Sequence, residues 1–295
     1  MKWSTQQRIE FIETRLFWEG KITRKDLIDF FGISEPQATK DIREYIIIAE
    51  NNVLYDHSIK QYVTTPNFTP KISAQSSEKY LNMLKLIGEK EDKFFNGIVP
   101  SFSVMPMLRR FVDTEMLKRL LKDIRDNNAI KINYQSMGAP DPKERWITPH
   151  SLAYDSSRWH VRALCHNSKE YKDFNLGRIL SINNSTQHVF DHSIDYEWHN
   201  KIDIIIAPNP LFSEKHKALV ERDYYMEEGQ IKVSLKAAFF FYFKYQQGFD
   251  DNKTHPPEKY PIVILNRQEI EIKMDLLKSM SKNKIKDLAL INELA

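Results

Sequence analysis

The sequence has little of several features that would narrow the class of protein at once. Its 295 residues include one cysteine, Cys165, and eight glycines. A single cysteine cannot form an internal disulfide framework, and it fits a reducing compartment. The few glycines form no glycine-rich phosphate loop, and no Gly-x-Ser-x-Gly segment is present. The sequence therefore argues against a disulfide-rich secreted domain and against enzymes built on either motif.

Long apolar segments are also absent. The first residues, MKWSTQQRIEF, lack the apolar core of a signal peptide, and the longest aromatic run is AAFFFYF at 237–243. That run is far shorter than the roughly 20 apolar residues of a membrane span. We expect a cytoplasmic protein with no membrane partner. A hydrophobic content of 41% with 12% aromatics is globular, and the length allows two or three domains.

The chain has little net charge. Forty-three Lys and Arg against 40 Asp and Glu give +3, so any affinity for nucleic acid must come from local patches. Residues 1–65 carry nine basic and ten acidic side chains, whereas residues 119–180 carry eleven basic and seven acidic ones. The N-terminal segment, in which the motifs below predict DNA binding, is thus not basic overall.

The N-terminal segment contains predicted helices over residues 4–18 and 23–31. Apolar residues recur at helical spacing in both, and Ser4 and Thr23 are the candidate N-caps. The stretch GISEPQATKDIREY, residues 32–45, then predicts a tight glycine turn and a third, polar helix.

The third helix has a well-marked start. Ser34 is its predicted N-cap, and Gln37 stands three residues later, where a capping box requires Glu or Gln. Pro36 is tolerated because the N–H groups of the first turn have no partner within the helix. Ala38 and Ile42 are expected to face the core, which leaves a polar outer side.

A predicted hairpin follows, with NVLYD and KQYVTT flanking HSI. Helix, short helix, glycine turn, polar helix and hairpin in this order predict a winged helix-turn-helix that binds DNA. A winged helix that binds protein is the alternative. The residues expected to contact bases or phosphates are Lys21, Arg24, Lys25, Ser34, Gln37, Thr39, Lys40, Arg43 and Lys60.

The rest of the chain changes pattern several times. TTPNFTP (64–70) predicts a linker, and two helical segments follow it. From residue 129 the apolar period is two, which predicts short strands of a small barrel or strongly bent sheet. Beyond Asp191, strands mix with helices, among them AAFFFYFKYQQ before Gly248. The predicted domains are 1–66 winged helix, 67–127 helical connector, 128–191 strands, and 192–295 C-terminal extension.

A row of cationic side chains is predicted in the strand region. Alternation in SRWHVRALCH places Arg158, His160 and Arg162 on one face of a strand, and Trp159 and Val161 on the core face. Such a row suits anion capture, because the arginine guanidinium offers a fixed fork of donors to phosphate.

Other interpretations of the row stay open. These residues could form ion pairs with Asp155, Glu144 or Asp173. A metal site using the nearby histidines lacks the usual ligand spacing, and Cys165 is expected on the apolar face, where a thiol is inert. We therefore expect no cofactor, no metal and no catalytic residue.

At this point a family resemblance is visible. RWHVRA (158–163) occupies the place of the tryptophan–tyrosine–leucine signature of WYL domains, with INYQS and RWITPHSLAY before it and KDFNLGRI after it. The chain resembles WYL-domain transcriptional regulators over essentially its whole length. It is most similar to the BrxR/CapW-like repressors found beside anti-phage defence operons. The signature departs from the family pattern at His160 and Val161.

The resemblance implies an α+β multidomain fold: a winged helix-turn-helix, a helical connector, an Sm/SH3-like β-barrel and a C-terminal α/β extension that dimerises. It also implies a polar pocket in the barrel that binds an anionic effector, a nucleotide or single-stranded nucleic acid. By position, that pocket draws on Tyr134, Ser136, His150, Arg158, Trp159, His160, Arg162 and Arg178.

The sequence therefore predicts a homodimeric repressor that binds double-stranded DNA at an inverted repeat and senses an effector. An RNA-binding or RNA-processing accessory protein that uses the barrel surface is one alternative. A metal-dependent nuclease or hydrolase that uses His150 is a more distant one.

Overall fold

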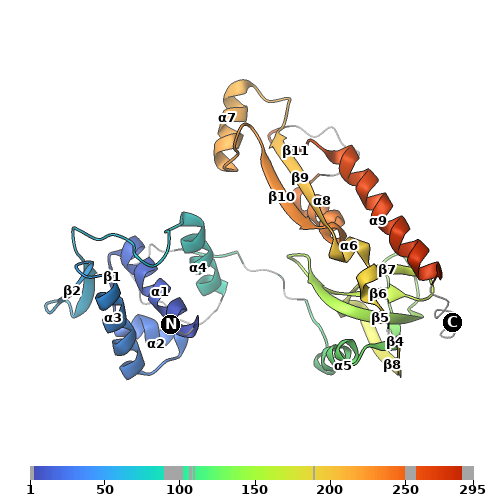
Figure 1. Ribbon diagram of the computed structural model, residues 1–295, viewed down its shortest axis with the longest axis horizontal. Coiled ribbons are helices and arrows are strands. Elements are labelled where there is room, and N and C mark those ends of the chain that lie inside the picture. Colours follow the sequence, from blue (N-terminus) through green and yellow to red (C-terminus); the bar gives the residue numbers. More distant parts are fainter. Residues whose placement is uncertain are drawn as a thin grey trace. The chain divides into compact units, whose positions relative to one another are not determined.

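The computed structural model describes residues 3–89, 102–105, 108, 110–188, 190–249 and 257–287. Contacts between Cα atoms divide the chain into two compact units, Met1–Leu108 and Arg109–Ala295 (Figure 1). Among the described residues, no helix combines the length and apolar character needed to cross a membrane.

The first unit begins with three helices, which are α1 (Trp3–Glu19), α2 (Arg24–Phe31) and α3 (Glu35–Ile48). Their inward faces form one apolar core, including Ile12, Leu27 and Ile42, none more than 1% exposed. The three predicted helices are confirmed. Ser4 lies inside α1, so its predicted role as an N-cap is wrong.

A small antiparallel sheet completes the winged helix. Its strands are β1 (Lys21–Ile22), β2 (Val53–Asp56) and β3 (Gln61–Thr64), in the order β1-β3-β2. The predicted hairpin is thus present. The two-residue β1 was not predicted, because so short a strand has no periodicity of its own.

The segment predicted as a linker, residues 64–70, and the residues directly after it pack against this core. The buried Glu13 carboxylate of α1 accepts hydrogen bonds from the backbone N–H groups of Lys71, Ile72 and Ser73 at 2.7–3.1 Å. Asn52 exchanges two hydrogen bonds with Thr69. These contacts fix the chain as it approaches α4 (Ser77–Glu89).

The second unit contains a five-stranded antiparallel sheet in the order β7-β6-β5-β4-β8. The strands are β4 (Asn128–Tyr134), β5 (Lys143–Tyr154), β6 (Trp159–Cys165), β7 (Glu170–Asn175) and β8 (Ile179–Gln187), with the 3-10 turn η1 (Leu176–Arg178) before β8. Helix α5 (Thr114–Arg125) packs Met116 and Leu120 into the core of this sheet.

The sheet bends but does not close within the described residues. Register shifts interrupt the β4–β8 and β5–β6 pairings, and β7 and β8 are not hydrogen-bonded to each other. The closed Sm/SH3-like barrel is therefore not confirmed. Strand β8, which pairs with β4, was not predicted because its second half, NNSTQ, is polar and exposed.

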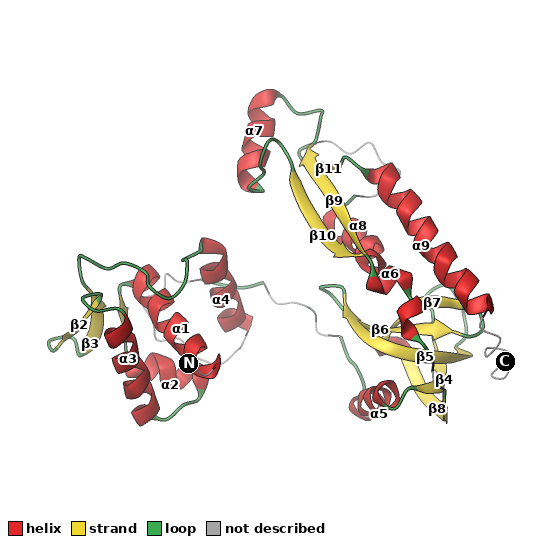
Figure 2. Ribbon diagram, viewed as in Figure 1, coloured by secondary structure: helices red, strands yellow, loops and turns green. Residues whose placement is uncertain are grey.

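The C-terminal part builds a second sheet, in the order β10-β9-β11, with helices beside it (Figure 2). Its elements are η2 (His192–Ile194), α6 (Tyr196–His199), β9 (Lys201–Pro208), α7 (Glu214–Asp223), β10 (Ile231–Lys236), η3 (Ala237–Phe239), α8 (Phe240–Gln247), β11 (Ile262–Ile264) and α9 (Arg267–Asp287). The predicted helix at AAFFFYFKYQQ is confirmed, and Gly248 ends it in the left-handed conformation (φ 73°).

Helix α9 joins the two sheets of the second unit. Ile270 and Leu277, in its first half, pack with β9 residues in the C-terminal core. Ile285, near its other end, packs with Leu164 of β6 and Tyr171 of β7. One helix thus contacts both sheets, as the view in Figure 1 also shows.

Candidate functional site

The turn between α2 and α3 is defined by its caps. Thr23 and Asp26 form a reciprocal capping box at the start of α2, and Gly32 ends it with φ 64°. Only glycine adopts this conformation readily, so the turn stays tight. Ser34 then accepts the N–H of Gln37 at 3.4 Å and caps α3, with Pro36 in the first turn. The sequence therefore fixes where α3 begins.

Helix α3 has one buried and one exposed face. Ala38, Ile42 and Tyr45 are at most 1% exposed. Lys40 and Arg43 are exposed on the opposite side, and neither forms an ion pair with any described residue. Two cations are therefore free to contact an external anion.

The other predicted DNA contacts fall into two groups. Lys25 and Lys60 are exposed, and Lys60 lies in the hairpin turn of the wing with φ 55°. Lys21 and Arg24 are half-buried; the backbone of Lys21 pairs with Val63, and Arg24 lies 3.4 Å from Glu35.

Three polar side chains of α3 already have partners within the protein. The Ser34 hydroxyl accepts the cap hydrogen bond, and the Thr39 hydroxyl donates to the Glu35 carbonyl oxygen at 3.0 Å. The Gln37 amide donates to the buried Asp41 carboxylate at 2.8 Å instead of completing the predicted capping box. Asp41 also accepts from Arg8 at 2.6 Å, which ties α3 to α1.

Strand β6 is buried on both faces apart from Trp159 at its start. Val161, Ala163 and Cys165 face the core of the sheet, as the alternation predicted. Trp159 was predicted on the same core face, and that prediction is wrong: at the strand's start it is 48% exposed and packs on Tyr154 with ring centroids 4.9 Å apart. The opposite face of β6 carries His160 and Arg162, which are only 5% and 4% exposed.

Arg162 is the centre of a buried ion-pair network. It donates to both oxygens of Asp195 at 2.7 and 2.8 Å, to Glu197 at 3.0 Å, and to Asp173 at 3.4 Å. The His150 Nε2 atom lies 3.0 Å from Asp195. The network links β5, β6 and β7 to the segment that enters the C-terminal sheet.

Charge and burial oppose each other in this network. Burial alone raises the pKa of Asp195, but hydrogen bonds from Arg162 and His150 outweigh it and lower that pKa to about 2. Burial lowers the pKa of Arg162, and the carboxylates around it raise it by more. Both groups are therefore charged at neutral pH.

The network shows that two residues of the expected ligand pocket are occupied within the protein. Arg162 and His150 are engaged with carboxylates and do not face a free cavity, because residues 195–197, distant in sequence, cover them. Of the ion-pair partners considered from sequence, Asp173 contacts Arg162 and Asp155 lies 3.5 Å from Arg158. Glu144 pairs instead with Lys131 at 2.6 Å.

A pocket of about 330 Å³ lies beside the network, between the sheet and α8. We call it the α8 pocket. Its lining includes four of the predicted ligand residues, which are Tyr134, Arg158, His160 and Arg178. Ser136 lies in the turn after β4 and Trp159 packs on Tyr154, so neither lines it. The remaining lining residues are Asp155, Ser157, Asp173, Asn175, Phe241, Tyr242, Tyr245 and Gln246.

Tyr242 joins α8 to the sheet across this pocket. Its hydroxyl donates to Asp173 at 3.1 Å, and its ring lies 5.1 Å from that of His160. Burial and the adjacent Asp173 raise the pKa of Tyr242. Burial lowers the pKa of His160, so its imidazole is neutral at pH 7.

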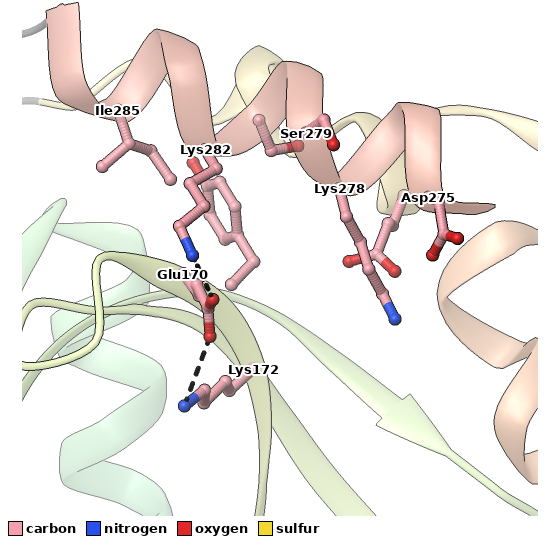
Figure 3. A pocket seen from close by; sticks show the side chains of 10 residues that line it. Glu170, Lys172, Asp275, Lys278, Ser279, Lys282 and Ile285 are labelled. Atoms are coloured by element: carbon pink, nitrogen blue, oxygen red, sulfur yellow. Dashed lines mark hydrogen bonds and ion pairs between the residues drawn. The ribbon is translucent and has the colours of Figure 1, made fainter. Parts of the chain in front are cut away.

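A second pocket, of about 500 Å³, lies between α9 and β7 (Figure 3). Figure 3 shows lysines and carboxylates facing each other across it. Glu170 accepts from Lys282 at 3.0 Å and lies 3.5 Å from Lys172. Because Lys172 and Lys282 share this carboxylate, the pocket offers less free positive charge than its lysines suggest.

Comparisons with known proteins agree with this architecture. Family models match residues 4–86 as the BrxR transcriptional regulator winged helix-turn-helix domain and residues 115–183 as a WYL domain. A third model matches residues 201–270 as the BrxR transcriptional regulator C-terminal dimerization domain.

Three curated relatives are described as the DNA-binding transcriptional repressor CapW. The protein of Escherichia coli strain KTE188 is 38% identical over 273 residues, that of Pseudomonas aeruginosa 34% over 274, and that of Stenotrophomonas maltophilia 32% over 280. Each match covers 91% or 92% of this chain and the same share of the relative. The chain belongs to the BrxR/CapW family of transcriptional repressors.

The matched family domains can be related to the helices and strands of the structure. In this BrxR/CapW-family chain, α3 belongs to the matched winged helix, and the five-stranded sheet lies largely in the WYL match. Helix α8 lies in the matched dimerization domain, which supports a homodimer. The relatives are named as repressors, which is a non-enzymatic role.

Sequence reasoning missed the residues that come from outside the strand region. Asp195 and Glu197 bind Arg162, and Phe241, Tyr242 and Tyr245 line the α8 pocket. The aromatic run AAFFFYFKYQQ was a visible signal, since a helix of eight residues cannot bury so many rings on one face. Which surface the exposed rings meet depends on the tertiary fold.

Proposed function

We propose that the chain is a homodimeric, sequence-specific repressor that binds an inverted-repeat operator and responds to an anionic effector. The observation that carries the proposal is the exposure of Lys40 and Arg43 on the outer face of the capped helix α3. The similarity to repressors named CapW supports it. We also propose, from the family resemblance stated above, that it controls an anti-phage defence operon.

Helix α3 would lie in the major groove. Lys40 and Arg43 would contact base edges or phosphates, and Gln37 would present the part of its amide that Asp41 leaves free. The DNA backbone would be contacted by Lys21, Arg24 and Lys25, and also by Ser34 and Thr39. Lys60 would reach the backbone from the wing.

A dimer would compensate for the low charge of each DNA-binding domain. With nine basic and ten acidic residues in positions 1–65, one copy offers few phosphate contacts. Two copies held by the C-terminal domain would bind two half-sites together, which raises the overall affinity.

The effector would bind at the WYL sheet. Tyr134, Arg158, His160 and Arg178 line the α8 pocket and are the part of the predicted ligand set that we retain. An effector there changes DNA affinity only if it binds one of two conformations more tightly.

The direct test replaces both exposed cations of α3. Lys40→Ala combined with Arg43→Ala should weaken a gel shift with the DNA upstream of the gene by at least tenfold, and should flatten its dependence on salt. The control replaces Lys118 and Arg125, which are exposed on α5, and makes the same change in net charge. Equal binding by both double variants, or a preference for single-stranded RNA, would refute the proposed role of α3.

A further inference from the structure

Helix α3 carries one large apolar side chain that the core does not use. Three isoleucines end the helix, and Ile46 packs against the core of the first unit. Ile47 is 73% exposed, the largest exposed fraction of any apolar residue in α3. Isoleucine has a lower helix propensity than alanine or leucine, so an exposed isoleucine does not favour the helix either. Neither packing nor helix formation therefore explains this side chain.

Ile47 lies on the same face of α3 as the two exposed cations. Lys40, Arg43 and Ile47 stand at positions i, i+3 and i+7, which form one row on a helix surface. All three are exposed, whereas Ala38 and Ile42 are buried. The row from Lys40 to Ile47 extends about 10 Å along the axis, which is roughly three base pairs of DNA. A helix that presents the two cations to the major groove presents Ile47 to it as well.

The polar side chains of α3 leave few groups for the recognition of bases. The hydroxyl groups of Ser34 and Thr39 and the amide nitrogen of Gln37 form hydrogen bonds within the protein. The two exposed cations can bond to guanine or to phosphates. In the major groove, thymine is distinguished by its C5-methyl group, which apolar side chains contact. Ile47 is the exposed apolar side chain in the row that would face it.

A single exposed apolar residue is common on protein surfaces and needs no ligand. Leu81 of α4 is an example in the same unit, with 61% of its side chain exposed. Ile47 differs from Leu81 in its register with Lys40 and Arg43, on a helix whose start is set by the Ser34 cap. The argument for a ligand therefore comes from the position of Ile47 in the row, and Leu81 offers a matched control.

We propose that Ile47 is a specificity-determining residue that contacts the C5-methyl group of a thymine in each operator half-site. This inference rests on the proposed role of α3 in DNA binding and adds the chemistry of one base that the helix recognises. The contact contributes specificity without charge, because salt screens ion pairs and does not screen the burial of a methyl group.

The test is a double-mutant cycle between the full-length protein and its operator. A nuclease footprint on the DNA upstream of the gene first defines the two half-sites. Each thymine is then replaced by deoxyuridine, which lacks the methyl group, at the equivalent position of both half-sites. At one position the affinity of the unaltered protein should fall about fourfold for each half-site, as expected when one methyl group is no longer buried.

Ile47→Ala should weaken binding to the thymine operator by at least the same factor. It should lose no further affinity at that deoxyuridine position, because the contact is already gone. The salt dependence of its binding should equal that of the unaltered protein, since no charge is removed. Leu81→Ala should keep both the original affinity and the full effect of deoxyuridine.

Three results would overturn the inference. One is a deoxyuridine effect that persists in Ile47→Ala, or the absence of any thymine that shows this coupling. Another is a shift of the monomer–dimer equilibrium in Ile47→Ala, measured by light scattering, because Ile47 would then contact a second copy. The third is a large drop in its melting temperature, which would show that the side chain packs within the protein. If the unaltered protein protects no site, the proposed function is contradicted instead.

Discussion

At the scale of single residues, burial decides what each arginine of the WYL sheet can do. Arg162 and Arg178 both belong to the predicted ligand set, and the sequence around them does not separate them. In the fold, Arg162 is surrounded by Asp173, Asp195 and Glu197, whereas Arg178 lines the α8 pocket without an ion pair among the described residues. Arg162 therefore stabilises the fold, whereas the Arg178 side chain is available to bind an anion.

This difference predicts a large loss of stability for one arginine variant and a small loss for the other. Arg162→Ala should lower the free energy of unfolding by about 3–5 kcal/mol, because it leaves buried carboxylates without their counter-charge. Arg178→Ala should change it by less than about 1 kcal/mol, since that side chain is half-exposed. Urea denaturation followed by circular dichroism measures both. Similar losses for the two variants would contradict the assignment.

Buried histidines predict a loss of stability in mild acid. Burial lowers the pKa of His166 from its ordinary 6.5 to about 4, and the Thr148 hydroxyl lies 2.8 Å from its Nε2 atom. The neutral form is favoured in the folded state, so its full contribution is present above pH 6.5 and is lost as the pH falls towards 4. The loss should approach about 3 kcal/mol.

The free energy of unfolding, measured from denaturation curves between pH 7.5 and 4, tests the role of His166. His166→Gln should remove only the share of His166 in that window, because burial also lowers the pKa of His192 to about 4. The same change at the exposed His199 should remove none. Parallel curves for the wild type and the His166 variant would show that the histidine does not cause the loss.

At the scale of elements, local signals in the sequence were sufficient for the helices and insufficient for their surroundings. Thr23 and Gly32 predicted where α2 begins and ends, and Ser34 predicted where α3 begins, because capping depends on neighbouring residues only. The alternation in β6 predicted its two faces. It could not show that residues 195–197 and α8 cover the cationic face, since those contacts join positions 33 to 82 residues apart.

The segment after the wing illustrates the same limit. Its prolines predicted a linker over residues 64–70. Directly after it, Glu13 accepts hydrogen bonds from the backbone N–H groups of residues 71–73, and it accepts another from the Tyr45 hydroxyl of α3. One buried carboxylate thus connects the approach to α4 with α3, the helix that we propose contacts DNA.

This connection predicts a local effect of Glu13→Ala. The amides of residues 71–73 should lose their acceptor and exchange hydrogen at least tenfold faster, and stability should fall by about 1–3 kcal/mol. Hydrogen-exchange mass spectrometry resolves the segment. Glu10→Ala, on the same helix, is the control, because the Glu10 side chain bonds only to Gln6 at 3.4 Å within the described contacts. Unchanged exchange at 71–73 in the Glu13 variant would contradict the connection.

At the scale of the whole molecule, we propose that the first unit binds DNA and that the second senses the effector and dimerises. The order of motifs predicted DNA binding by the N-terminal part, and the resemblance to WYL-domain regulators implied an effector pocket and a dimerising extension in the rest. The sequence could not indicate that the WYL sheet and the C-terminal sheet form one unit, since α9 and the Arg162 network create that unit only in the folded chain.

The most direct test of the central claim is a nuclease footprint of the purified protein on the DNA upstream of its gene. We expect two protected half-sites related as an inverted repeat, bound about a hundredfold more tightly than either half-site alone. The Lys40→Ala and Arg43→Ala double variant should leave no footprint at the same concentration. A single asymmetric footprint, or one that the double variant retains, would contradict it.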